Sequence, residues 1–184
     1  MKWPAPDEFA GRWPLLLSLE NMKTLIIGLG NPILTDDGVG VKVARQLEER
    51  INLTAHPELE VTEASAGGLR LMEAVLDYDR VILIDAYYLH PDKTKPGRIH
   101  RMTLDDLRSV SPTQHSTSAH DTSLVTALDA ANELGYKVPQ EFIIYAVEVE
   151  NILDFSETPT LAVGDAIPVV VERIIEEFSF KTHK

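Results

Sequence analysis

The sequence predicts an α/β protein, organised as a single three-layer α/β/α domain with a mostly parallel central sheet and helices on both faces. Continuous apolar runs, such as residues 25–27 and 81–84, are typical of strands that are covered on both faces. These runs alternate with segments of helical periodicity, the pattern that parallel strands and their crossover helices produce. The 184 residues, of which 44% are hydrophobic and 25% charged, suffice for one domain with a substantial core.

The first strand and the turn after it organise the chain, because they place polar groups between an apolar strand and a helix. The strand is predicted over residues 23–28, and Gly28 and Gly30 allow the backbone to turn sharply where it ends. Pro32 excludes a continuing central strand. A helix follows and runs to about Arg50, with apolar residues at four-residue spacing along one face.

Two adjacent acids stand where this turn enters the helix. Asp36 is predicted to be the N-cap, and Asp37 to lie in the first helical turn, where the helix dipole favours a negative charge. Asp37 is therefore suited to accepting a proton or binding a cation. A simpler interpretation is that both acids only cap the helix. A dinucleotide-binding site fits poorly. Ile33 occupies the position of the third glycine in the G-x-G-x-x-G motif of such sites, and the acids would repel a pyrophosphate.

The later elements continue the alternation of strands and helices. Further strands are predicted over residues 58–63, 80–85, 98–102 and 142–147, with 98–102 at an edge. Further helices are predicted after Gly67-Gly68, after a cap at Thr103, from Ser118 to Gly135, and over residues 163–178, where Pro168 interrupts the helix early. Asp85 ends the third strand, so it belongs at the same sheet edge as the two acids of the first turn. Ligands of such folds bind beyond the carboxyl ends of the strands.

The charge and composition of the chain exclude several classes of function. The net charge of −12, from 17 basic and 29 acidic residues, opposes non-specific binding of nucleic acid or of an anionic membrane. It suits a metal, another cation or a basic peptide better. The absence of cysteine excludes disulfides, thiolate metal sites and a cysteine nucleophile. No apolar run approaches the roughly 20 residues of a membrane span, so the expected location is the cytoplasm.

Asp85 and His120 complete a candidate site with Asp37. A carboxylate at the end of an apolar strand must find a partner or face solvent. His120 shares a helix face with Leu124 and Ala127, so its ring is expected to point inward as a neutral ligand or base. Two carboxylates and an imidazole suit nickel, zinc or iron. Their spacing matches no local metal motif, and purely structural roles for Asp85 and His120 remain the alternative. The other five histidines are assigned no role.

The order of the motifs resembles the hydrogenase maturation proteases, endopeptidases that trim the C-terminal extension of nickel–iron hydrogenase large subunits. The opening motif is G-L-G-N-P over residues 28–32, followed by D-D-G-V-G over residues 36–40. The resemblance continues through residues 66–68, 79–86, 96–99, 118–121 and 147–148. It covers the chain from about Met22 to the last helix.

The resemblance implies a three-layer α/β/α domain and a trio of nickel-contacting residues. By motif position these are Asp37, Asp85 and His120, with glutamate common in the family where Asp37 stands. The resemblance also implies that nickel arrives inside the unprocessed large subunit, which is both substrate and partner. No Ser, Cys or H-E-x-x-H nucleophile motif occurs. We therefore expect an aspartyl-type endopeptidase in which Asp37 and Asp85 are catalytic and a carboxylate activates water.

Two other functions compete with this interpretation. The first five motif residues, 28–32, also resemble the start of peptidyl-tRNA hydrolases, but the His-Asn stretch of those enzymes is replaced by Thr35-Asp36-Asp37, and the acidic surface opposes tRNA. The second alternative is a non-proteolytic nickel-binding accessory protein on the same fold, since a fold does not fix a function. Cleavage of a purified precursor separates the accessory protein from the protease.

The first 21 residues differ in composition from the rest of the chain. They contain three prolines and both tryptophans, without clear periodicity, and Met22 directly precedes the first strand. The predicted organisation is therefore an irregular extension over residues 1–21 and a hydrogenase maturation protease-like α/β domain over residues 22–184.

We predict that a chain starting at Met22 processes precursor as fast as the full chain, because residues 1–21 contribute no part of the predicted core or site. A processing assay with equal amounts of the two proteins measures this. Lost activity in a truncated protein whose circular dichroism is native would instead show that the extension is functional.

Overall fold

The computed structural model describes residues 22–65, 67–88, 94–109 and 119–183, without the side chains of residues 109 and 119–123. Five strands form one sheet in the order β2-β1-β3-β5-β4. Strands β1 (Thr24–Leu29), β2 (Leu59–Ala64), β3 (Arg80–Tyr88) and β5 (Glu141–Val149) are parallel. Only the edge strand β4 (Ile99–Thr103) runs antiparallel, against β5. The mostly parallel sheet predicted from the sequence is confirmed.

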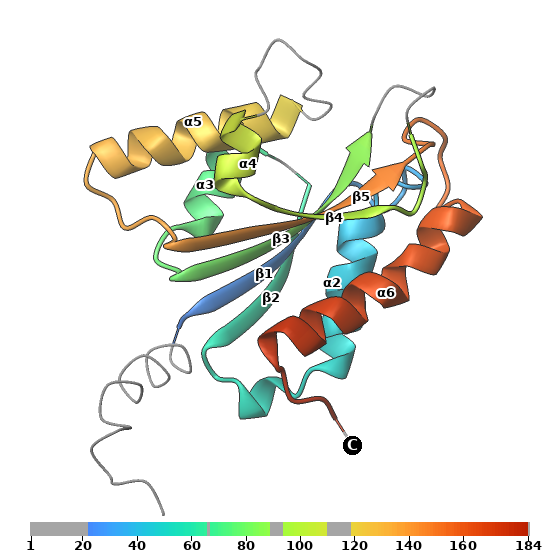
Figure 1. The fold of residues 1–184 in the computed structure, drawn as a ribbon, viewed down its shortest axis with the longest axis horizontal. Helices are drawn as coiled ribbons and strands as arrows, with labels where there is room; N and C mark the ends of the chain where they lie inside the picture. Colours follow the sequence, from blue (N-terminus) through green and yellow to red (C-terminus); the bar gives the residue numbers. More distant parts are fainter. Residues whose placement is uncertain (1–21, 66, 89–93, 110–118, 184) are drawn as a thin grey trace, which may run out of the picture.

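Helices cover both faces of this sheet, which gives the three predicted layers (Figure 1). One face carries α2 (Val39–Arg50) and α6 (Leu161–Phe178). The other carries α3 (Leu69–Val75), α4 (Leu104–Ser109) and α5 (Ala119–Glu133). A short 3₁₀ turn, η2 (Leu53–Ala55), leads from α2 to β2. Every helix in the described part of the chain is too short or too polar to cross a bilayer.

The strands supply side chains alternately to two apolar cores. Ile26, Ile82 and Ile84 pack with α2 and α6, whereas Leu25 and Leu83 pack with α3 and α5. This follows from the two-residue period of a strand, which sends neighbouring side chains to opposite faces. Both faces being covered explains why these strands are continuously apolar.

Two glycines bring the start of α2 into direct contact with the sheet. A Cβ atom at Gly28 would lie 2.3 Å from the carbonyl oxygen of Gly40, and a Cβ at Gly40 would lie 2.3 Å from that of Ile84. No side chain fits at either position. The close approach therefore fixes the amino end of α2 over the carboxyl ends of β1 and β3, where the turn acids lie.

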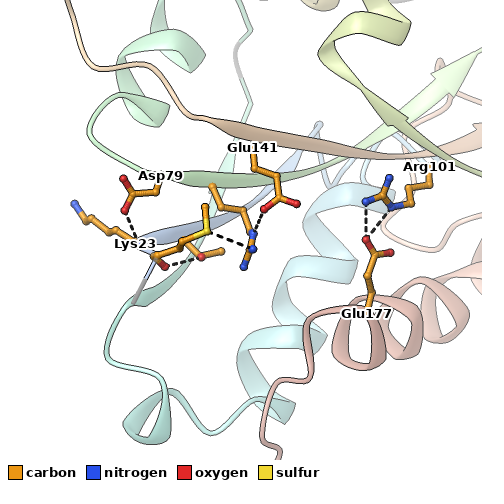
Figure 2. A network of polar contacts seen from close by, with 8 residues as sticks. Lys23, Asp79, Arg101, Glu141 and Glu177 are labelled. Atoms are coloured by element: carbon orange, nitrogen blue, oxygen red, sulfur yellow. Dashed lines mark hydrogen bonds and ion pairs between the residues drawn. The ribbon is translucent and has the colours of Figure 1, made fainter. Parts of the chain in front are cut away.

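Polar contacts close the opposite, amino-terminal edge of the sheet (Figure 2). The carboxylate of Asp79 accepts the backbone N–H of Lys23 at 2.9 Å, which ties the start of β1 to the start of β3. A hydrogen bond from Lys137, together with this N–H, lowers the pKa of Asp79. Arg80 pairs with Glu141 at the start of β5, and Arg101 of β4 pairs with Glu177 of α6. These contacts join the starts of β1, β3 and β5 to one another and β4 to the end of α6.

Local sequence signals agree with the structure at Thr103. The Thr103 hydroxyl accepts the backbone N–H of Asp106 at 3.2 Å, and the Asp106 carboxylate accepts the backbone N–H of Thr103 at 2.7 Å. This reciprocal pair is a capping box, which confirms the predicted start of the short helix α4.

Two expectations about element length are wrong. Helix α6 continues through Pro168 instead of being interrupted there. Losing one helical hydrogen bond and accommodating the ring costs about 3 kcal/mol, but buried residues on both sides of Pro168, from Val163 to Ile175, hold the helix on the sheet. Strand β3 continues three residues beyond Asp85 to Tyr88, because β5 pairs with it along its whole length.

We predict that Gly28→Ala destabilises the protein by roughly 3 kcal/mol, because its Cβ would overlap backbone that cannot retreat from the sheet. Gly164→Ala is the matched control, since its Cβ would meet only the Pro159 ring at 3.6 Å. In a helix this control is expected to raise stability by up to about 1 kcal/mol. Urea denaturation followed by circular dichroism measures both, and equal effects would contradict the close contact at Gly28.

Candidate active site at the carboxyl edge of the sheet

Asp36 holds two loops together at the carboxyl edge of the sheet. Its fully buried carboxylate accepts the backbone N–H groups of Glu150, Asn151 and Thr160 and the hydroxyl of Thr160, at 2.7–3.3 Å. These donors come from the segment between β5 and α6. A buried charge requires such partners, and here every contact is a charge-assisted hydrogen bond. Asp36 therefore joins the turn after β1 to the loop after β5.

The predicted N-cap role of Asp36 is wrong. Helix α2 starts at Val39, its cap residue is Gly38, and no side chain caps it. The backbone carbonyl of Asp36, not its carboxylate, accepts the Val39 N–H at 3.0 Å. The carboxylate points instead to the loop after β5. Four hydrogen-bond donors there satisfy more of its acceptor sites than a single helical N–H would.

Backbone hydrogen bonds extend the junction between the two loops. The N–H of Thr35 donates to the carbonyl of Ser156 at 2.9 Å, and the N–H of Ser156 donates to Ile33 at 3.0 Å. The N–H of Asp36 donates to the carbonyl oxygen of Asn151 at 3.0 Å. The Thr35 hydroxyl donates to the carbonyl oxygen of Asp154 at 2.6 Å. These hydrogen bonds therefore fix residues 31–37 and 150–160 relative to each other.

Asp37 is held differently from its neighbour. It lies in the turn before α2, not in the first helical turn as predicted. One carboxylate oxygen accepts the backbone N–H of Asn31 at 2.7 Å, and the residue remains partly exposed. At Gly30 the backbone has φ +132°, and a Cβ there would lie on the carbonyl oxygen of Asp37. The turn thus wraps closely around Asp37, and the residue nevertheless keeps some exposure to solvent.

Asp85 lies at the same edge, within β3. The register pairs Gly28 of β1 with Ile84, so Asp85 follows directly beside the end of β1, and across the sheet it pairs with Ala146 of β5. The side chain is buried, and one carboxylate oxygen accepts the N–H of Ala86 at 2.8 Å. By strand alternation it faces the same side as Leu83, the side covered by α3 and α5.

His120 is the second residue of α5, on that same side of the sheet. Its side chain, the residues 110–118 and the predicted capping box at Ser118 lie outside the described parts of the structure. The backbone therefore places α5 and Asp85 on the same side of the sheet, while the meeting of the side chains of Asp37, Asp85 and His120 stays a prediction. Among the described side chains, no three His, Cys, Asp or Glu residues form a metal site.

Sequence reasoning missed a further polar centre at Glu148. Its buried carboxylate accepts the backbone N–H of Lys95 at 2.5 Å, contacts Nε2 of His100 at 2.7 Å, and lies 3.9 Å from Arg98. It fastens the segment before β4 to the end of β5. An acid inside the apolar run of residues 142–149 was the available signal, because such a charge demands a partner.

Comparison with known proteins identifies the family. The family profile described as hydrogenase maturation protease matches residues 41–177. The chain belongs to the hydrogenase maturation protease family. It is therefore a peptidase, as the sequence predicted. The matched range includes Asp85 and His120 and begins just after Asp37.

Individual relatives agree with this assignment. The hydrogenase 2 maturation protease of Escherichia coli K12 is 25% identical over 156 residues, which cover 85% of this chain and 88% of the relative. The hydrogenase expression/formation protein HupD of Rhizobium leguminosarum is 24% identical over 155 residues, covering 83% of this chain and 72% of HupD. The solved structure of the E. coli hydrogenase maturating endopeptidase HybD has a TM-score of 0.72 at 24% identity, covering 88% of this chain and 96% of HybD, which shows that the fold is shared.

We predict that Asp36→Asn and Asp37→Asn differ sharply in their consequences for stability. The amide at position 36 would turn an N–H₂ group toward existing donors, and losing these bonds to a buried charge should cost about 3 kcal/mol. Asparagine at position 37 still accepts the Asn31 N–H, so its cost should be under about 1 kcal/mol. Chemical denaturation of both variants measures the difference, and equal losses would refute the separate roles.

Proposed function

We propose that this protein is an endopeptidase that removes the C-terminal extension of a nickel–iron hydrogenase large-subunit precursor after nickel insertion. The observation that carries this proposal is that the adjacent acids Asp36 and Asp37 differ in burial and in hydrogen bonding. Asp36 is buried and saturated with hydrogen bonds, whereas Asp37 is kept partly exposed at the sheet edge that also carries Asp85. Membership of the hydrogenase maturation protease family supplies the class of substrate. We place the reaction in the cytoplasm.

In the proposed reaction, Asp37 and Asp85 are catalytic, and together with His120 they contact the nickel ion that the precursor carries. One carboxylate accepts a proton from water as the water oxygen attacks the scissile carbonyl carbon. The nickel of the precursor, or the second carboxyl in its protonated form, would supply the polarisation of that carbonyl. The carbon–nitrogen bond then breaks, and the proton passes to the departing amine. The products are the mature large subunit with a free carboxylate and the released C-terminal peptide.

We assign nickel to the substrate because the protease offers few ligands for it. Two carboxylates and one imidazole provide three donors, and the chain has no cysteine. Such a set should hold free nickel weakly, since softer and more numerous ligands make tight sites. Ligands from the precursor complete the coordination, so recognising the substrate and sensing its metal become one event. The acidic chain makes nucleic acid an unsuitable partner.

The test is to incubate the purified protease with nickel-loaded and nickel-free precursor and to follow release of the C-terminal peptide. We expect cleavage of the loaded precursor only. Asp85→Asn should abolish cleavage because the amide keeps the shape and removes the charge that attracts the cation, and His120→Ala should do the same. Asp165→Asn, which makes the same chemical change at an exposed position of α6, is the matched control and should cleave normally.

Three results would reject this proposal. Equal cleavage of loaded and nickel-free precursor would exclude metal sensing. Full activity of Asp85→Asn would remove that residue from the site. Tight binding of the loaded precursor without any cleavage would favour a non-proteolytic nickel-binding accessory protein.

A further inference from the structure

Large apolar side chains are exposed where the two joined loops reach the surface. Ile33 is 46% exposed, and Leu153, Phe155 and Leu161 are each 82% exposed. We call these four residues the apolar platform. Ile33 comes from the turn after β1, Leu153 and Phe155 from the loop after β5, and Leu161 is the first residue of α6. Exposed apolar groups that gather in this way mark interaction surfaces more often than single exposed residues do.

The hydrogen bonds at this edge hold the platform in place. Leu34 and Ser156 form a parallel β-bridge, and the Ser156 N–H donates to the carbonyl oxygen of Ile33, so Ile33 and Phe155 are held as neighbours. The Asn151 side chain accepts the N–H groups of Leu153 and Asp154, which fixes the next turn. A surface that is ordered before binding loses little conformational entropy when a partner arrives.

The platform is continuous with the candidate active site. Ile33 and Asp37 lie in two successive turns, which the hydrogen bonds from the Leu34 N–H to Asn31 at 3.1 Å and from the Asp37 N–H to Leu34 at 2.9 Å close. Leu161 follows Thr160, whose N–H and hydroxyl bind the Asp36 carboxylate. A molecule seated on the platform is therefore brought close to Asp37, which is partly exposed.

The charges around the platform indicate the chemistry of its partner. Glu150, Asp154 and Glu157 are exposed in the same loop. One cation lies beside them, since the Lys42 ammonium donates to the carbonyl oxygen of Pro32 at 3.5 Å and interacts with Glu157. Three acids against this lysine leave the border negative, as is the chain as a whole, with a net charge of −12. A partner that complements the platform therefore has a surface that is apolar at its centre and bordered by lysine or arginine. A second copy of this chain fits poorly, because two-fold pairing through the platform would bring like acidic rims together.

We propose that the apolar platform is the docking surface for the folded body of the large-subunit precursor, which presents an apolar face with a basic border. This inference rests on the proposed function and adds to it a second contact, separate from the cleaved C-terminal extension. The platform determines which protein is held, and the site of Asp37 and Asp85 determines whether it is cut.

The test compares two double variants in binding and in processing of purified nickel-loaded precursor. Leu153→Ser with Phe155→Ser should raise Kd at least about tenfold, as truncating interface anchors does, and the change in processing should appear in KM rather than kcat. Leu134→Ser with Tyr136→Ser is the matched control, since these residues are 76% and 59% exposed beyond the far end of α5. That control should bind and process like the unaltered protein.

The outcomes separate the docking surface from the proposed reaction. If the unaltered protein cleaves and the Leu153/Phe155 variant binds equally well, docking at the platform is overturned and the peptidase function stands. If the unaltered protein binds but never cleaves, while the variant loses binding, docking stands and the reaction fails. If the variant only converts a dimer into a monomer in sedimentation and keeps its affinity for precursor, the platform is a self-association surface and the proposal is overturned. Absence of both binding and cleavage in the unaltered protein would overturn both proposals.

Discussion

The buried carboxylate of Asp36 is the interaction on which the active edge depends. Its position in the interior would be costly without partners, and four hydrogen bonds from the loop after β5 supply them. The same bonds connect two chain segments that are otherwise separate. They hold the residue next to Asp37, tie down the loop that carries the apolar platform and anchor the start of α6. One structural acid thus positions both the chemistry and the surface proposed to hold the substrate.

The fold could be predicted from the sequence because its cause is local and repeated. Continuous apolar runs such as residues 81–84 indicate covered strands, and the periodic stripes between them indicate crossover helices. The features that the sequence did not predict were decided by packing between distant elements. Pro168 remains within α6 because apolar residues before and after it are buried against the sheet. Strand β3 passes Asp85 because β5 offers partners as far as Tyr88.

The candidate site was less accessible to sequence reasoning. Asp37, Asp85 and His120 were singled out by their places at a strand end and at two helix starts, and the order of the family motifs, not their spacing, indicated that they act together on nickel. The separate roles of Asp36 and Asp37 could not be seen, because the partners of Asp36 lie 114–124 residues away along the chain. Glu148 was overlooked for the same reason, since its contacts come from the segment before β4. Buried charges reveal that partners exist, but only the fold identifies them.

The proposed function depends above all on contact between nickel held by the precursor and the side chains of Asp37, Asp85 and His120. Nickel K-edge X-ray absorption measures this contact, using a nickel-loaded precursor whose cleavage site has been altered to resist hydrolysis. On adding the protease, we expect new nitrogen or oxygen ligands on nickel, which Asp85→Asn and His120→Ala reduce. A nickel spectrum that stays unchanged while the two proteins are shown to be bound would contradict the assignment of these three residues.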